Sequence, residues 1–406
     1  MIDAPLADQL RHAADAVACR LADPGTSLGG HPQSLSRGAT GVAMLHAEQA
    51  ARGLGDWYTV HAWLQAATSG PLAAGVQASL FFGAPAMAFA LHPAARHPGR
   101  YQHALAALDT SVASIVERRL AQAHARIARG QRPGVAEFDA INGLTGLGAH
   151  LRRRHPDSEL FHRVLTYLIR LTCPLTADDP LPGWWTSEPP TGRRAAAYQG
   201  GGHSNHSISH GICGPLALLS LAARDGIVLD GQHKAIARIC SWLDSWRQEH
   251  QTGPWWPEIV TADEVQAGRA HQTHPLRPSW CYATPGHARA QQLAGLALHD
   301  TDRQRTAERA LIGCLTDPAQ HQRLTGSGLC HGAAGLFQTA WRVAADAPST
   351  DVAAYLPGLA AQMLATADSI EETGVLNGAA GWALALSTAA GDQPPATGWD
   401  AFLLLT

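Results

Sequence analysis

Two cysteines stand at the same position relative to a short glycine motif that recurs along the chain. Cys281 lies two residues before Ala283, Cys330 lies two residues before Gly332, and His331 follows Cys330 directly. Two thiolates and an imidazole are typical zinc ligands, and three protein ligands leave a fourth tetrahedral position for water or a substrate, as in catalytic zinc sites. The spacing alone is equally compatible with two buried thiols beside an unrelated histidine, because free cysteine is among the most buried residue types. The shared offset favours the metal site.

The motif, Gly-x-x-Gly, occurs seven times, and each copy precedes an apolar stretch. The copies begin at Gly38, Gly83, Gly143, Gly211, Ala283, Gly332 and Gly378. The second copy ends in Ala86 instead of glycine, and the fifth begins with alanine. The intervals of 45 to 72 residues leave room for two helices each, and residues 109–128 and 235–249 have amphipathic helical patterns. Because strand signals are sparse, the sequence predicts seven helical hairpins.

Seven hairpins can stack as an open solenoid or close into a ring. No polar capping repeat is evident, and both ends carry apolar segments, including residues 402–405, which favours closure. The sequence therefore predicts an all-α fold, an α/α toroid or double barrel of seven inner and seven outer helices, with residues 1–406 in a single domain. The turns before the inner helices would all lie at one end of the ring. The residues expected to converge there are Arg37, Phe82, Asn142, His210, Tyr282, His331 and Asn377.

Composition excludes several classes of protein. Charged residues make up only 16 % of the 406 residues, against roughly 25 % in an ordinary soluble domain, and the net charge is −3. This balance argues against disorder and against a nucleic-acid partner. No apolar run reaches the roughly 18–20 residues that span a bilayer, and the N-terminal residues lack the pattern of a signal peptide. We therefore expect a cytoplasmic protein without a transmembrane segment.

The remaining cysteines do not share the offset of Cys281 and Cys330. Seven cysteines are an odd number, which argues against a disulfide scaffold in a long cytoplasmic chain. We expect the other five to be buried thiols without a chemical role: Cys19, Cys173, Cys213, Cys240 and Cys314.

Three segments carry a resemblance to a known family. Residues 280–286 (WCYATPG), 329–332 (LCHG) and 209–212 (SHGI) resemble the signature segments of the lanthionine synthetase C-like family, the lanthipeptide cyclases. The sevenfold motif is similar too, so the resemblance extends over essentially the whole chain. Ala283 departs from the glycine usual in the family, but it lies outside the expected ligands.

The resemblance implies an α/α toroid that carries one catalytic Zn²⁺. By motif match, Cys281, Cys330 and His331 would hold the ion. The implied reaction is a thioether-forming, lyase-type cyclisation. In it, a peptide cysteine thiol adds to dehydroalanine or dehydrobutyrine, which gives lanthionine or methyllanthionine rings.

The resemblance also implies four catalytic residues. His210 and Asp139 match the catalytic histidine and aspartate of the family, and Arg277 and Tyr282 match further active-site positions. Histidine titrates near neutrality and suits proton transfer, while a cation and a phenol suit an oxyanion. The residue types alone leave simpler readings open: a histidine at a helix start, an aspartate cap, a surface arginine and a packed tyrosine. Addition of the thiol produces an enolate that must be protonated at its α-carbon. The residues do not indicate which of these groups supplies that proton.

The implied partners are a dehydrated precursor peptide and separate dehydratase enzymes. One alternative function is a peptide-binding scaffold with weak or no catalysis, and another is a relative that adds glutathione to dehydro residues. A glycoside hydrolase on the same fold is disfavoured, because Asp139 has no second carboxylate at a convergent turn. The tryptophan-rich segments 181–206 and 253–257 could grip a peptide or could be packed loops.

Overall fold

The computed structural model describes residues 2–25, 31–96, 100–190, 198, 200–367, 370, 372–391 and 393–406. Packing divides the chain into two compact units. Unit 1 comprises residues 1–115, 321–402 and 406, and unit 2 comprises residues 116–320 and 403–405. Both are mostly helical, and each is described by itself. The single domain predicted for residues 1–406 remains a prediction.

Unit 1 is built from helices that come from both ends of the chain. Its helices are α1 (Ala4–Arg20), α2 (Ala39–Ala51), α3 (Trp57–Ala67), α4 (Ala84–Ala94), α15 (Ala333–Asp346), α16 (Leu356–Ala365) and α17 (Ala379–Ala389). Short 3-10 helices cover Ala353–Tyr355 and Trp399–Leu403. The helix α5 (Gln102–Ala128) begins in this unit and ends in unit 2.

Unit 2 contains further helices and the short strands. Its helices are α6 (Val135–Phe138), α7 (Leu144–Arg154), α8 (Glu159–Leu171), α9 (Cys213–Arg224), α10 (Gln232–Ser245), α11 (Ala262–Ala267), α12 (Thr284–Leu298) and α13 (Thr301–Thr316). The short helix α14 (Pro318–His321) begins in this unit and ends at the first residue of the next segment of unit 1. Strand β1 (His203–Asn205) pairs antiparallel with β4 (Ile259–Thr261), and β2 (Gln248–His250) pairs antiparallel with β3 (Gly253–Trp255). The helix expected over 235–249 is α10, which ends before β2.

Each copy of the glycine motif opens a buried helix, as the sequence predicts. These helices are α2, α4, α7, α9, α12, α15 and α17, and most of their residues are buried. The helices between them are amphipathic. In α8, for example, Phe161, Val164, Leu165, Leu168 and Leu171 are buried along one face.

The second glycine of the motif is required by a close approach of the backbone. A Cβ atom added to Gly286, Gly335 or Gly381 would lie 2.0, 1.9 or 1.7 Å from the carbonyl oxygen of the residue six positions earlier. Real Cβ atoms do not come this close to an oxygen. In these three copies the turn therefore leaves no room for a side chain at this position, whereas α4 has Ala86 there.

Replacing Gly381 with Ala is expected to destabilise the protein by about 2 kcal/mol or more, because the Val375 carbonyl must move. Gly358 offers a matched control: it is also the third residue of a helix, but it is exposed and has no atom within 4 Å of an added Cβ. Gly358→Ala is expected to be neutral or to stabilise by about 0.5 kcal/mol. Urea unfolding midpoints of the two variants test this, and equal midpoints would contradict it.

Backbone hydrogen bonds join the motif turns of unit 2. The amide of Ala140 donates to the carbonyl of Ser209 (2.9 Å), and the amide of Ile208 donates to the carbonyl of Cys281 (3.1 Å). The turns before α7, α9 and α12 are therefore neighbours, as expected if the residues that precede the motif converge.

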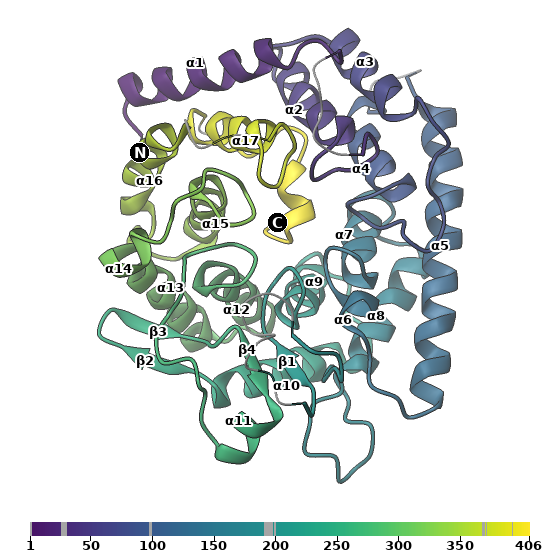
Figure 1. Ribbon diagram of the computed structural model, residues 1–406, viewed down its shortest axis with the longest axis vertical. Helices are drawn as coiled ribbons and strands as arrows, with labels where there is room; N and C mark the ends of the chain where they lie inside the picture. Colours follow the sequence, from purple (N-terminus) through teal and green to yellow (C-terminus); the bar gives the residue numbers. More distant parts are fainter. Residues whose placement is uncertain are drawn as a thin grey trace. The chain divides into compact units, whose positions relative to one another are not determined.

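The same kind of bond joins the turns of unit 1. Leu35 donates to Phe81 (2.9 Å), Leu376 donates to Ser36 (3.2 Å), and Cys330 donates to Leu376 (2.8 Å). The last motif turn thus pairs with the first, and α17 packs against α1 and α2 (Figure 1). This pairing of the first and last repeats is what ring closure predicts and what an open solenoid lacks.

The tryptophans of the two aromatic segments belong to the core. Trp184, Trp185, Trp255 and Trp256 are each no more than 3 % exposed. These four tryptophans therefore pack in the core and do not form an exposed rim that grips peptide. Residues 191–197 and 199 of the first segment lie outside the described residues.

Candidate active site and metal centre

Asp139 and His210 form a hydrogen-bonded pair in unit 2. Asp139 ends the short helix α6 and is fully buried, and its Oδ2 lies 2.6 Å from His210 Nδ1. Its Oδ1 accepts hydrogen bonds from the amides of Asn142 (2.6 Å) and Gly143 (2.7 Å), just before α7. Asp139 therefore caps the start of α7, which is the structural role that its residue type alone suggested. It also holds His210 in place.

The imidazole of His210 is oriented from two sides. Its own amide donates to Ser207 Oγ (2.9 Å), and its Nδ1 faces the Asp139 carboxylate. A carboxylate only accepts, so Nδ1 carries a proton and Nε2 is the nitrogen left to exchange one. The His210 side chain is 34 % exposed, so part of it is accessible to a ligand.

Tyr282 lies beside His210. The ring centroids are 6.0 Å apart, and Asn205 Nδ2 donates to the phenol oxygen (3.2 Å). Burial raises the pKa of Tyr282, and hydrogen bonds from Asn205 and Ser207 oppose that rise. Tyr282 therefore keeps its hydrogen at neutral pH and can donate it.

Arg277 is half-buried on the segment that leads to Tyr282. Among the described residues, no hydrogen bond or ion pair to its guanidinium is present. The structure thus brings His210, Asp139 and Tyr282 together, whereas it links Arg277 to none of them.

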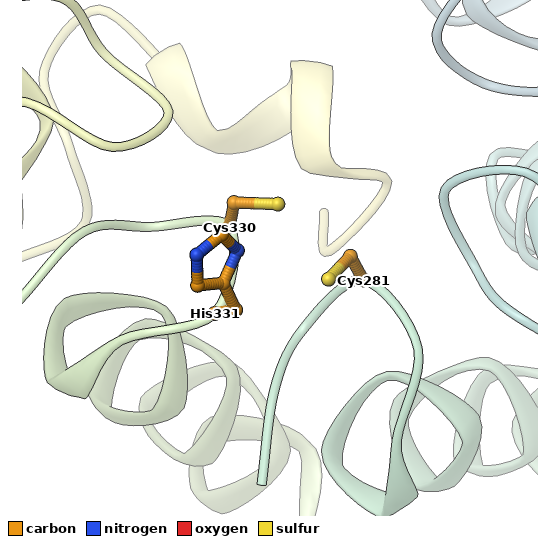
Figure 2. Close-up of side chains that lie close together, drawn as sticks. All are labelled: Cys281, Cys330 and His331. Carbon is orange, nitrogen blue, oxygen red and sulfur yellow. The ribbon is translucent and has the colours of Figure 1, made fainter. Parts of the chain in front are cut away.

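The three predicted metal ligands also lie close together. Cys281, which is buried, and Cys330 and His331, which are half-buried, each offer one ligand atom, and these atoms lie within 4.8 Å of one another. Figure 2 shows the three side chains clustered. No other group of three potential ligands is this compact within the described parts of the chain.

The chemistry of this donor set fits zinc. Two thiolates and one imidazole are soft and borderline ligands, and a trio leaves one tetrahedral position open. Cys281 is held through its side chain and its backbone. Its thiol lies 3.7 Å from Ser279 Oγ, and its carbonyl accepts from the Ile208 amide (3.1 Å) and from Ser209 Oγ (3.3 Å). The turn before α9 therefore also anchors one of the three ligands.

The other cysteines differ from this trio. Cys213, Cys240 and Cys314 are buried, and burial raises the pKa of all three thiols, that of Cys240 to about 12. Their burial is as predicted, and their raised pKa values favour the protonated thiol at neutral pH. For Cys19 the prediction of burial is wrong, because it lies on the exposed face of α1, and Cys173 is only half-buried.

Three residues at the site were missed in the sequence. Asn205 and Ser207 hold Tyr282 and His210, and Arg119, on α5, donates to the Asn142 carbonyl. Burial lowers the pKa of Arg119, and the charge of Asp139 opposes this. All three act through folded contacts and belong to no motif, so residue type and spacing gave no signal.

Comparison with known proteins decides the family. A sequence model of the lanthionine synthetase C-like proteins matches residues 30–404. The chain belongs to this family. The nisin biosynthesis protein NisC of Lactococcus lactis subsp. lactis is 24 % identical over 208 residues, which are 50 % of this chain and 48 % of that protein. The matched stretch thus spans about half of the curated relative.

A solved structure of a nisin cyclase is similar over almost the whole chain. The TM-score is 0.80 with 21 % sequence identity, and the match covers 97 % of each chain. This similarity shows the fold, an α/α toroid, as predicted from the repeats. Among the described residues, no helix has both the length and the apolar character that crossing a membrane requires.

Proposed function

We propose that this protein is a zinc-dependent lanthipeptide cyclase. It would add the cysteine thiols of a dehydrated precursor peptide to dehydroalanine or dehydrobutyrine in the same peptide. The observation that carries the proposal is the compact group of Cys281, Cys330 and His331 in a member of this family. A scaffold that only binds peptide has no need of such a group beside an ordered Asp139–His210 pair.

Cys281, Cys330 and His331 would hold the metal ion. A zinc ion bound there would lower the pKa of a substrate thiol, which is about 8.5 when free, so that the thiolate forms at neutral pH. The half-buried positions of Cys330 and His331 are compatible with access for a peptide side chain.

The reaction adds the thiol across the Cα=Cβ double bond of the dehydro residue. The S–H bond and the π bond are broken, the sulfur bonds to the β-carbon, and a proton is added at the α-carbon. Attack at the β-carbon places negative charge on the neighbouring carbonyl oxygen. Tyr282, which keeps its hydrogen, and Arg277, which has no partner among the described side chains, would stabilise this charge.

His210 and Asp139 would carry out the proton transfer. With Nδ1 held by the buried carboxylate, His210 Nε2 can take a proton from the entering thiol or give one to the α-carbon. Asp139 stabilises the imidazolium formed in the process. The dehydro residues must be made beforehand, so we also propose separate dehydratases as partners. A cytoplasmic location remains a prediction.

The test is incubation with a dehydrated precursor peptide, followed by thiol alkylation and mass spectrometry. Cyclisation leaves the peptide mass unchanged and removes alkylatable thiols. Peptide that binds but keeps its full number of free thiols would contradict the cyclase and favour the scaffold. A mass increase by glutathione, when glutathione is supplied, would favour the glutathione-adding alternative.

A further inference from the structure

Asn205 lies at the end of β1 and is hydrogen-bonded at both ends of its side chain. Its Oδ1 accepts from the amide of Ser207 (3.0 Å), and its Nδ2 donates to the phenol oxygen of Tyr282 (3.2 Å). A backbone amide can only donate, so the Ser207 contact fixes which end of the carboxamide is oxygen. The amino group of Asn205 must therefore face Tyr282.

This orientation decides what the phenol can do. Because the Tyr282 oxygen accepts from Asn205, its own hydrogen is not used in that contact. With Asn205 donating to its oxygen, Tyr282 can donate its own hydrogen to another group.

Asn205 also links Tyr282 to the histidine turn. Its carbonyl accepts a hydrogen bond from the amide of Ile212 (2.9 Å), just before α9. The hydroxyl oxygen of Ser207 accepts a hydrogen bond from the amide of His210. A Cβ on Gly211 would lie 2.4 Å from the Asn205 carbonyl and 2.5 Å from its Oδ1. The turn that carries His210 is therefore built around this side chain.

We propose that Asn205 is a positioning residue that keeps Tyr282 as a hydrogen-bond donor toward the oxyanion of the substrate. The proposal rests on the proposed function, in which Tyr282 stabilises charge during thiol addition. Asn205 acts through Tyr282 and need not touch the substrate.

Asn205→Asp is the sharpest test, because it keeps the size of the side chain and the acceptor for Ser207. The carboxylate can only accept, so it takes the phenol hydrogen that the substrate needs. We expect kcat for cyclisation to fall about 10- to 100-fold, somewhat less than for loss of a direct oxyanion donor, with KM changed by less than about threefold. In Asn205→Ala the phenol hydrogen stays free, and we expect a smaller loss.

If Asn205 had only a structural role, the isosteric Asn205→Asp would lower kcat less than Asn205→Ala does. The proposal predicts the opposite order. Asn205→Ala slower than Asn205→Asp would overturn the proposal. A double-mutant cycle adds a second measurement: in a Tyr282→Phe background, Asn205→Asp should change kcat by less than about twofold. Independent, additive losses would also overturn it.

A readout without catalysis separates this inference from the proposed function. With 3-fluorotyrosine at position 282, the ¹⁹F resonance should shift in Asn205→Asp and less in Asn205→Ala, relative to wild type and without peptide. An unchanged resonance in Asn205→Asp overturns the role of Asn205 whether or not the protein cyclises peptides. Full activity of Tyr282→Phe would instead contradict the proposed role of Tyr282.

Discussion

Cys330→Ala is expected to abolish stoichiometric zinc binding and to slow thioether formation at least about a thousandfold. Metal ions lower the activation free energy by several kcal/mol, and a change of about 1.4 kcal/mol in that free energy changes the rate tenfold. Removal of one thiolate leaves Cys281 and His331, too few ligands to hold the ion firmly. Metal analysis of the purified variant, together with counting of free thiols in the product peptide, measures both effects.

Binding of the dehydrated peptide to Cys330→Ala should be largely preserved, because the remaining surface is unchanged. Cys19→Ala is the matched control, since it makes the same substitution at an exposed thiol on α1 and should retain both metal and activity. Full cyclisation by metal-free Cys330→Ala would refute the zinc mechanism. Loss of metal from Cys19→Ala would show that the assay does not report on the proposed site.

His210→Ala is expected to lower kcat by about 10² to 10⁴, the range typical for loss of a general acid or base, while zinc stays bound. Asp139→Asn should act in the same direction, because a neutral amide cannot stabilise the imidazolium and can present its NH₂ group to Nδ1. Single-turnover cyclisation rates, measured alongside zinc content, separate proton transfer from metal loss.

Asp139→Asn must be distinguished from a folding defect, because Asp139 also accepts the amides that lead into α7. With its NH₂ group turned toward Nδ1 of His210, Asn keeps its oxygen as the acceptor for both amides, so thermal stability should fall only modestly, by about 1 kcal/mol. Wild-type kcat in His210→Ala would contradict its role. A loss of zinc equal to the loss of activity would point instead to a structural effect.

The repeats made the fold predictable from sequence. Each copy of the motif opened a buried helix. In several copies a carbonyl approaches too closely for any residue but glycine, and the apolar stretch that follows has no polar face to expose. The ends of the helices that lie between the motifs were predicted less accurately. The helix expected from residue 109 begins at Gln102, since no motif marks its start.

The site was predictable only where it touches the motifs. Cys281, Cys330 and His331 were found through their offset, and His210 and Asp139 through the family resemblance. Nothing in the sequence signalled Asn205, because its importance lies in two hydrogen bonds that exist only in the folded chain. The exposure of Cys19 was missed because residue type predicts burial only on average.

The hydrogen bonds between motif turns have a consequence for how the protein can change. They join backbone atoms, Ala140 to Ser209 and Ile208 to Cys281 in unit 2, and Cys330 to Leu376 in unit 1. No side chain takes part, so mutation at the residue preceding each motif leaves these bonds in place. Such positions can be exchanged, by selection or by design, to install new reactivity on an unaltered frame.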